Sequence, residues 1–362
     1  MKKIAFVVRM FQIERFYAGG EKFIYQIIKE FIRNNYIIDI YCEKSETETP
    51  SGINKIIVNN CHSHDYIETE KHYQKLNDEI NQNSYDYVIT DGVTPYSETL
   101  LLQVFSKKYN LAQILYYKIF KPEKLIQSHY EEKWLTQERN KIIVVSNKLK
   151  QHLIKKYKIQ SEKISVIYPG AEEFSENLTL KPQNQTPYTF GISATFFKRK
   201  GGLLFLLALI ITKLRGQKYN AIMILRNTSK AILLKKILKL FNMEQNVTFF
   251  PFQETMTDFY SQINCLVMPS HEEAFGLVAL EAMLNKIPTI VSSCSGISEI
   301  LQDKVNGNVF KFNLFASFNL ANKMIQVVNN SAQAEECLNN AYITAKKYNW
   351  DLTFTEIKKA LK

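Results

Sequence analysis

Short β-rich runs and helical stretches alternate from one end of this 362-residue chain to the other. Strands that alternate with helices indicate parallel sheets with right-handed crossovers, and therefore an α/β fold. The first series of predicted strands comprises residues 3–8, 36–42, 55–58, 85–90, 112–117, 141–145 and 165–168. The second series comprises residues 188–193, 220–225, 247–250, 265–268 and 289–292. Because the chain is too long for one ordinary core, two doubly wound, Rossmann-like domains are expected.

A polar segment between the two series is the best candidate for an interdomain linker. Pro169 and Gly170 end the first series, and the segment that follows is polar and contains two further prolines. The predicted organisation is an N-terminal domain over 1–170, a linker over 171–187, a C-terminal domain over 188–345 and a final helix over 346–362. Trp350 and Phe354 are expected to anchor that helix on the N-terminal domain.

Composition and charge narrow the class of protein. The hydrophobic content of 46% and charged content of 22% are typical of a folded globular protein rather than a disordered one. The five scattered cysteines have neither metal-ligand nor redox spacing, which favours a reduced compartment. The first strand is too short for a secretory signal, and the apolar stretch 203–211 is about half a membrane span. We therefore expect a cytoplasmic protein.

The formal charge of +11 is unevenly distributed along the chain. Residues 177–243 contain many Lys and Arg but no Asp or Glu, and residues 107–163 are also rich in Lys and Arg. Such regions favour anionic partners, such as diphosphates, lipid headgroups or nucleic acid. For most of these side chains, a solvated basic surface is the simpler interpretation.

Three loops that join a strand to a helix carry unusual residues, and ligands of doubly wound sheets bind at such loops. In the first loop, Gly19 and Gly20 would let the backbone approach an anion, although such a pair is more often a simple turn. In the second, Arg199 and Lys200 precede a helix whose dipole repels cations. A bound pyrophosphate would offset that repulsion, and an exposed basic turn is the alternative.

The third loop, with the helix that follows it, has two glutamates in an apolar setting. Glu281 lies among aliphatic residues and needs hydrogen-bond donors, such as sugar hydroxyls, to offset the cost of its desolvation. Glu273 stands at the start of the same predicted helix, where it could meet a second set of hydroxyls. The alternatives are a cap on the helix dipole for Glu273 and a solvated helix face for Glu281.

The segment from Ser270 to Met283 resembles the Glu-x7-Glu motif of family-4 glycosyltransferases of the GT-B fold, with Glu273 and Glu281 as its glutamates. The resemblance continues in the segments 145–146, 166–172, 199–201, 288–291, 296–300 and 306–307, and it spans almost the whole chain. The segment 193–201 also resembles bacterial lipopolysaccharide-core glycosyltransferases.

The resemblance implies a GT-B fold with two domains that face each other across a cleft, and it implies roles for particular residues. Glu281 would hold the donor ribose and Glu273 the transferred sugar, while Arg199 and Lys200 would neutralise the diphosphate. The other residues implied in donor binding are Phe275, Gly276, Leu277 and Val278, through their backbone, with Gly19 and Gly20 closing over the donor from the first domain.

The implied reaction is a metal-free transfer of a hexose-type sugar from a nucleotide-diphosphate sugar, with UDP-sugars favoured and the anomeric configuration retained. No cofactor is expected, and the Asp-x-Asp metal motif of the other large glycosyltransferase class is absent from the sequence. The implied acceptor is a cell-surface glycan or glycolipid, such as lipopolysaccharide core. The basic region 107–163 would suit an anionic glycolipid at the inner face of the cell membrane.

The sequence departs from the family pattern at several positions. Gly191-Ile192 replaces the usual Gly-Arg, and Arg226 stands where a Gly-x-Gly is expected, so Arg226 could supply the missing positive charge. Asp91 takes the place of a histidine on the acceptor side, for which His129 is a weaker substitute. The pair His62-x-His64 has metal-like spacing but no third ligand nearby, which favours solvated side chains.

Two other functions remain compatible with the same motifs. A nucleotide-sugar epimerase of the same fold would turn over its donor without an acceptor, since fold does not fix reaction. A non-catalytic GT-B protein could bind anionic partners alone. Nucleic-acid binding has no recognised motif to support it, and no nucleic-acid partner is predicted.

Overall fold

The computed structural model divides into two compact units, each described here by itself. Unit 1 comprises Met1–Pro169 with Trp350–Lys362, and unit 2 comprises Gly170–Asn349. The structure describes residues 1–11, 19–45, 49–58, 66–91, 98–105, 114, 118, 122–137, 141–174, 187–226, 229–251, 256–329 and 331–362. Most of the predicted linker, residues 175–186, lies outside this set.

Unit 1 is built on a parallel sheet with the strand order β3-β2-β1-β4-β5-β6-β7 among the described residues. Its strands are β1 (Lys3–Phe11), β2 (Ile37–Ser45), β3 (Lys55–Val58), β4 (Tyr87–Asp91), β5 (Thr99–Leu102), β6 (Lys141–Val144) and β7 (Ile164–Val166). Its helices are α1 (Gly19–Arg33), α2 (Tyr66–Gln82), α4 (Pro122–Leu135), α5 (Asn147–Tyr157), the short 3₁₀ turn Ser161–Lys163 and α12 (Trp350–Leu361). The order reverses between β1 and β4, which is the topological switch point of a Rossmann-like sheet.

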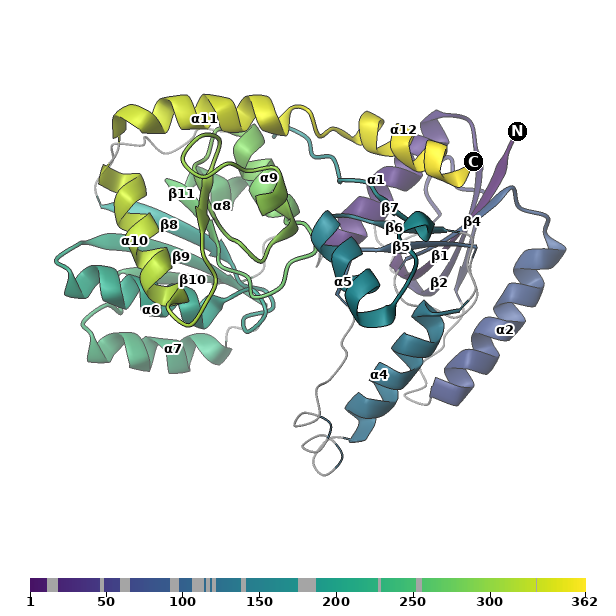
Figure 1. The fold of residues 1–362 in the computed structure, drawn as a ribbon, viewed down its shortest axis with the longest axis horizontal. Helices are drawn as coiled ribbons and strands as arrows, with labels where there is room; N and C mark the ends of the chain where they lie inside the picture. Colours follow the sequence, from purple (N-terminus) through teal and green to yellow (C-terminus); the bar gives the residue numbers. More distant parts are fainter. Residues whose placement is uncertain are drawn as a thin grey trace. The chain divides into compact units, whose positions relative to one another are not determined.

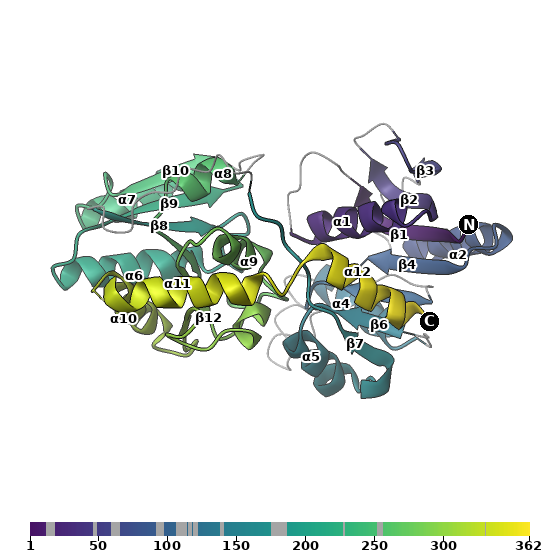
Figure 2. The same cartoon turned by 90° about the horizontal axis from the view of Figure 1, so that it is seen from above.

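The core of unit 1 follows from the hydrophobic pattern of β1 and α1. Strand β1 is buried on both faces, as expected for a central parallel strand. Helix α1 buries one apolar face, and α12 packs against it (Figure 1 and Figure 2). The ring of Phe354 lies 4.9 Å from Phe31, and that of Trp350 lies 5.7 Å from Phe23. These aromatic contacts attach the C-terminal helix to unit 1.

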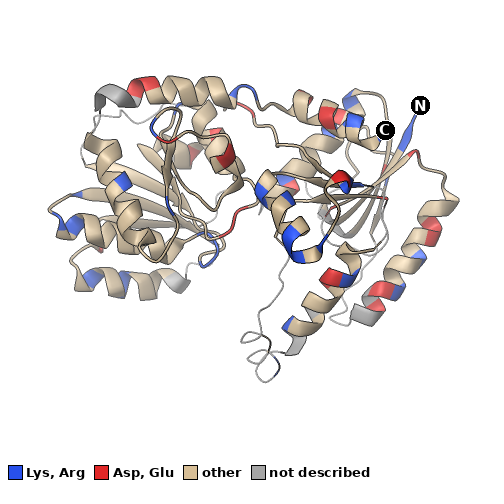
Figure 3. Cartoon of the chain, in the orientation of Figure 1, with Lys and Arg blue, Asp and Glu red and all other residues tan. Residues whose placement is uncertain are grey.

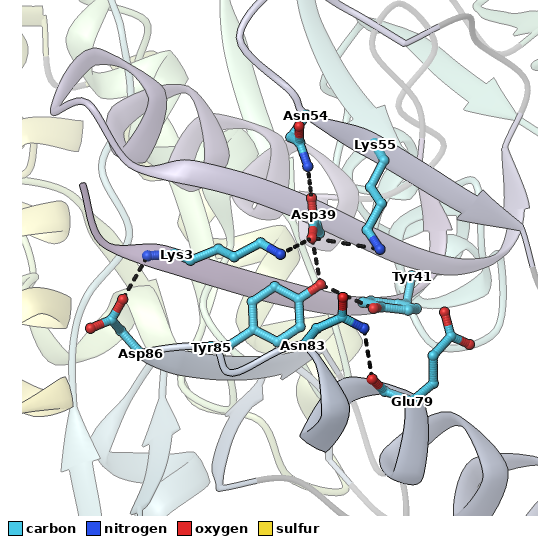
Figure 4. A network of polar contacts seen from close by, with 9 residues as sticks. All are labelled: Lys3, Asp39, Tyr41, Asn54, Lys55, Glu79, Asn83, Tyr85 and Asp86. Atoms are coloured by element: carbon cyan, nitrogen blue, oxygen red, sulfur yellow. Dashed lines mark hydrogen bonds and ion pairs between the residues drawn. The ribbon is translucent and has the colours of Figure 1, made fainter.

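A buried carboxylate ties together the amino ends of the strands in unit 1 (Figure 4). Asp39 on β2 accepts hydrogen bonds from the Tyr85 hydroxyl at 2.5 Å and from the Asn54 amide at 2.6 Å. The Lys3 ammonium lies 3.1 Å from the same carboxylate, and that of Lys55 lies 3.8 Å from it. Because ligands of such sheets bind at the opposite, carboxyl end, this network has a structural role.

Unit 2 repeats the same architecture with the described strand order β10-β9-β8-β11-β12-β13. Its strands are β8 (Tyr188–Ser193), β9 (Tyr219–Leu225), β10 (Val247–Pro251), β11 (Cys265–Met268), β12 (Thr289–Ser292) and β13 (Asn308–Phe310). Its helices are α6 (Gly202–Leu214), α7 (Ser229–Leu240), α8 (Thr257–Ser261), α9 (Leu277–Leu284), the 3₁₀ turn Gly296–Glu299, α10 (Ala316–Asn329) and α11 (Ser331–Ala345). Here the order reverses between β8 and β11.

Helices cover both faces of the sheet in unit 2. Figure 1 shows α6 and α7 on one side and α9 and α11 on the other. One core cluster includes Phe190 of β8, Met223 of β9 and Phe205 of α6, all fully buried. This packing fixes β8 and β11 side by side, so that the loops at their carboxyl ends share the switch point.

Most predicted strands are confirmed to within about three residues at either end. Two described strands, β5 and β13, are missing from the prediction. Strand β5 has the sequence TLLL, which is buried throughout and shows no alternation, and β13 has only three residues. The predicted strand at 112–117 lies outside the described residues except for Ile114, which is helical.

Among the described residues, no helix is both long enough and apolar enough to span a bilayer.

Candidate active site

The candidate site of unit 2 is formed by the loops that follow β8 and β11. Each loop runs from the carboxyl end of its strand to the start of a helix, α6 and α9 respectively. The first-turn N–H groups of an α-helix have no partner within the helix, and the helix dipole favours negative charge there. Two helix N-termini at one switch point therefore form a setting suited to an anion.

The loop after β8 requires a glycine at its end. Gly201 is the N-cap of α6 and adopts the left-handed conformation with φ +74°. A Cβ atom there would lie 2.1 Å from the carbonyl oxygen of Pro269 in the neighbouring loop. The absence of a side chain thus lets the two loops pass against each other, which brings Arg199 and Lys200 to the second loop.

The loop after β11 also ends on a glycine with positive φ. Gly276, at φ +118°, is the N-cap of α9, and a Cβ atom there would collide with Met268. The residues on either side, Phe275 and Leu277, are buried and half-buried. Leu277 and Val278 open the first turn of α9. The predicted backbone site at Phe275–Val278 is thus a loop that enters a helix N-terminus.

Glu273 and the two cations of the other loop are brought together. The Lys200 ammonium is hydrogen-bonded to the carboxylate of Glu273, and Nη1 of Arg199 lies 3.7 Å from the same oxygen. The Ser270 hydroxyl donates a weak hydrogen bond to that oxygen at 3.5 Å. The backbone N–H of His271 donates to the Arg199 carbonyl at 3.0 Å, which locks the loops to each other.

The electrostatics of this cluster favour an ionised Glu273. Burial raises the pKa of the Glu273 carboxyl, but the charges of Lys200 and Arg199 and the hydrogen bonds from Lys200 and Ser270 more than offset it. The net result is a pKa below the ordinary value of a glutamate. The cluster of Arg199, Lys200 and Glu273 therefore carries one net positive charge next to two helix N-termini, and can accept a further anion.

Glu281 lies on α9 with its side chain buried, and one of its partners is a residue that the sequence analysis missed. The Tyr260 hydroxyl lies 3.2 Å from a Glu281 carboxylate oxygen and 2.9 Å from the Val278 carbonyl. Burial and the nearby Glu281 carboxylate raise the pKa of Tyr260 well above its ordinary value, so its hydroxyl remains a donor. A buried glutamate in an apolar helix requires such a donor, and that requirement is the signal that could have pointed to a tyrosine.

Arg226 lies against an aromatic side chain that Arg199 also contacts. It follows β9, and its guanidinium lies 5.8 Å from the centre of the Phe196 ring. The guanidinium of Arg199 lies 5.2 Å from the same ring. Phe196 thus holds two cations near the β8–α6 loop by cation–π contact. The sequence prediction that Arg226 supplies positive charge to the donor site stays a prediction.

Unit 1 has a polar group at its own switch point. Asp91 ends β4 and accepts a hydrogen bond from the Gln103 amide at 3.1 Å, and the same amide nitrogen lies 3.3 Å from the Gly20 carbonyl. Burial raises the pKa of Asp91 to about 7, with a smaller contribution from the Glu21 charge and an opposing one from Gln103. Gln103 was not foreseen, since it follows β5, which the sequence prediction lacks.

The remaining predicted residues are spread over unit 1. Gly19 and Gly20 were predicted in the loop that precedes the first helix, but they form the first turn of α1, in unit 1. His129 is exposed on α4, beside the ring of Tyr130. His62 and His64 lie outside the described residues. Within the described part of the chain, no group of three or more His, Cys, Asp or Glu is arranged to hold a metal ion.

The chain has two Rossmann-like units, and in the parallel sheet of each unit the order of the strands reverses at a switch point. In unit 2, the Glu-Lys-Arg cluster lies at that point. This architecture is that of the GT-B class of α/β protein. The family described as "Glycosyltransferase Family 4" matches residues 17–173, and the family described as "Glycosyl transferases group 1" matches residues 175–344. The chain belongs to these glycosyltransferase families, which together cover most of its length.

Individual proteins are also similar to this chain. The O-antigen chain mannosyltransferase RfbU of Salmonella typhimurium is 30% identical over 169 residues, which are 44% of each chain. The chain spans only 60% and 62% of two other curated relatives with longer alignments. Two solved structures share the fold over nearly the whole chain.

The first is WaaG, a glycosyltransferase involved in lipopolysaccharide biosynthesis, with a TM-score of 0.75 at 16% identity over 99% of this chain and 98% of that one. The second is HepE of Anabaena in complex with UDP-glucose, with a TM-score of 0.73 at 16% identity over 100% and 99%. At such identities these similarities establish the fold alone.

Proposed function

We propose that the protein is a retaining glycosyltransferase that moves a hexose-type sugar from a nucleotide-diphosphate sugar, with UDP-sugars favoured, to a glycan or glycolipid acceptor. The observation that carries this proposal is the Arg199, Lys200 and Glu273 cluster between the N-termini of α6 and α9. A diphosphate supplies the anion that this arrangement lacks.

The diphosphate would be the leaving group, and its developing charge would be stabilised by the cluster. Arg199 and Lys200 contribute positive charge, and the N–H groups of Leu277 and Val278 contribute the dipole of α9. These groups are fixed before the substrate binds, because both loops are locked to each other through His271 and Gly201. We infer that no metal ion is needed for this stabilisation.

The two glutamates would serve different parts of the donor. Glu273, held by Lys200 and Ser270, would accept hydrogen bonds from hydroxyls of the transferred sugar. Glu281, oriented by Tyr260, would accept them from the ribose. A carboxylate that is already oriented loses little conformational entropy when it binds a hydroxyl.

The acceptor side would lie at the switch point of unit 1, where Asp91 and Gln103 meet the start of α1. Asp91 would accept a hydrogen bond from the acceptor hydroxyl that attacks the sugar. Proton removal from that hydroxyl would be shared with the departing phosphate, as the family resemblance implies.

Three relatives support the proposed substrate classes. HepE was solved with UDP-glucose, RfbU is named as a mannosyltransferase of the O-antigen chain, and WaaG is described as a lipopolysaccharide enzyme. We therefore favour a UDP-sugar as donor and a cell-surface glycan or glycolipid as acceptor. Synthesis of such acceptors from cytosolic nucleotide-sugars would place the protein in the cytoplasm, at the inner face of the membrane.

A donor panel tests this proposal. Thermal shift and slow hydrolysis are measured with UDP-, GDP-, ADP- and CMP-sugars, with and without EDTA. We expect one nucleotide to stabilise the protein and to be released from its sugar, with no effect of EDTA. No response to any donor would favour a non-catalytic protein, and conversion of the donor sugar to its epimer without acceptor would favour an epimerase.

A further inference from the structure

The outward face of α6 and α7 in unit 2 combines large apolar side chains with lysines. The exposed apolar residues are Leu203, Leu207, Leu214, Ile232, Leu233 and Leu240, between 44% and 80% exposed. We call these residues, with the Lys and Arg among them, the α6–α7 face. Scattered exposed leucines are ordinary, but six on two neighbouring helices are an unusual surface for a monomer.

The apolar residues of this face are aligned rather than scattered. On α6, positions 203, 207 and 214 are separated by four and seven residues, so their side chains lie in one stripe along the helix. On α7, Leu233 and Leu240 are seven residues apart and share a face in the same way. The ends of the two helices are joined, because the Lys213 ammonium donates to the Asn242 carbonyl just after α7.

Positive charge is interleaved with these side chains. Lys235, Lys236 and Lys239 are exposed on α7, and Lys213 and Arg215 stand at the end of α6. The sequence contains no Asp or Glu from Asn177 to Met243, and Figure 3 shows only Lys and Arg coloured on α6 and α7. The first acid after this run, Glu244, lies beyond the end of α7.

Three kinds of partner could cover such a face, and the charge and the apolar side chains of the face distinguish among them. A second copy of the same face in a two-fold dimer would set lysines against lysines. A nucleic acid would pair with the lysines but would leave the leucines in water. An anionic lipid surface satisfies both, since headgroups meet the lysines and the leucines enter the acyl boundary.

We propose that the α6–α7 face docks unit 2 on an anionic membrane surface. This inference goes beyond the proposed reaction and is independent of it. It also differs from the sequence expectation that the basic region 107–163 of unit 1 meets the membrane. Helices α6 and α7 would lie in the interface plane, with their long axes along the lipid surface.

Vesicle co-sedimentation of the full chain tests the proposal. One set of vesicles contains phosphatidylcholine and phosphatidylglycerol in equal amounts, and the other contains phosphatidylcholine alone. We expect binding to the anionic vesicles only, and we expect it to weaken as salt is raised. The triple variant Lys235→Gln, Lys236→Gln, Lys239→Gln should bind roughly 100-fold more weakly, at about fivefold per lysine.

Two further variants complete the design. Ile232→Gln with Leu233→Gln should weaken binding at least about tenfold, since two inserted side chains are lost while the helix propensity is kept. The matched control Lys155→Gln, Lys156→Gln, Lys158→Gln removes the same charge from the α5 region of unit 1 and should change binding by less than about twofold. All variants should keep wild-type melting temperatures and donor hydrolysis in solution, because the altered residues are exposed.

Several results would overturn the proposal. Wild-type protein that stays in solution with anionic vesicles would do so, and so would an α5 control that loses binding while the α7 variants keep it. Self-association abolished by Ile232→Gln with Leu233→Gln would instead assign the face to a second copy. Absence of sugar transfer with intact vesicle binding would contradict the proposed reaction and leave the docking surface standing.

Discussion

Glu273 is the residue on which the candidate site depends, because it connects the two loops at the switch point of unit 2. Its carboxylate holds Lys200 and Arg199 in one place, whereas the sequence indicated either the transferred sugar or the helix dipole as its partner. Cations held by an internal carboxylate are oriented before the donor arrives, and electrostatic stabilisation of a leaving group depends on such preorganisation.

Substitution of the two glutamates should separate turnover from binding. We expect Glu273→Gln to lower kcat about 100-fold with little change in donor affinity, since it disturbs the groups that stabilise the leaving group. Glu281→Gln should weaken donor binding roughly tenfold through lost hydrogen bonds to the ribose. Steady-state kinetics and calorimetry measure both effects. Glu272→Gln, next to Glu273, is the matched control, and equal behaviour of all three variants would refute these roles.

Asp91 should control the pH dependence of transfer. Its pKa, raised to about 7 by burial, means that the carboxylate form grows as pH rises through neutrality. Transfer to an acceptor should therefore increase between about pH 6 and 8. Asp91→Asn should remove this increase of the transfer rate with pH and leave donor hydrolysis at its wild-type rate. An unchanged profile in the variant would show that Asp91 takes no part on the acceptor side.

At the scale of single elements, the amino ends of β1, β2 and β3 are held together by the Asp39 network. Burial raises the pKa of Asp39, but hydrogen bonds from Tyr85 and Asn54 and the proximity of Lys3 outweigh it and leave the pKa below its ordinary value. A carboxyl group with a depressed pKa in the folded state stabilises the fold above its unfolded pKa, and that contribution is lost as pH falls.

We therefore expect the stability of unit 1 to fall below about pH 4 as Asp39 becomes protonated. Asp39→Asn should destabilise the protein by about 2 kcal/mol at neutral pH through loss of charge-assisted hydrogen bonds. Melting curves of the wild-type protein and of Asp39→Asn, measured from pH 3 to 8, check both expectations. The melting temperature of the variant should depend less on pH in the acid range, and equal dependence in the two proteins would count against the network.

The elements show what the sequence can and cannot predict. β8, β11 and β12 were predicted at their observed bounds, because buried parallel strands are short apolar runs bounded by polar segments. β5 was missed, and Gln103 was missed with it. Tyr260 lies on a five-residue helix with no readable period, so its position beside Glu281 depends on tertiary packing alone.

For the whole molecule, the two-unit plan follows from the alternation of strands and helices, and the comparisons with known glycosyltransferases confirm the GT-B fold. The motif around Glu273 and Glu281 indicated the family, and the matches to two glycosyltransferase families confirm it. The pairing of Arg199 and Lys200 with Glu273 was not predicted, because spacing along a chain says nothing about contacts between two loops.

The central claim is that the cluster of Arg199, Lys200 and Glu273 binds the diphosphate of a nucleotide donor without a metal. Isothermal titration of UDP, UMP and uridine in EDTA tests it most directly, with wild-type protein and Lys200→Gln. We expect UDP to bind at least about tenfold more tightly than UMP, and Lys200→Gln to abolish most of that difference. Equal affinity for UDP and UMP, or binding of UDP only after a divalent cation is added, would contradict the account.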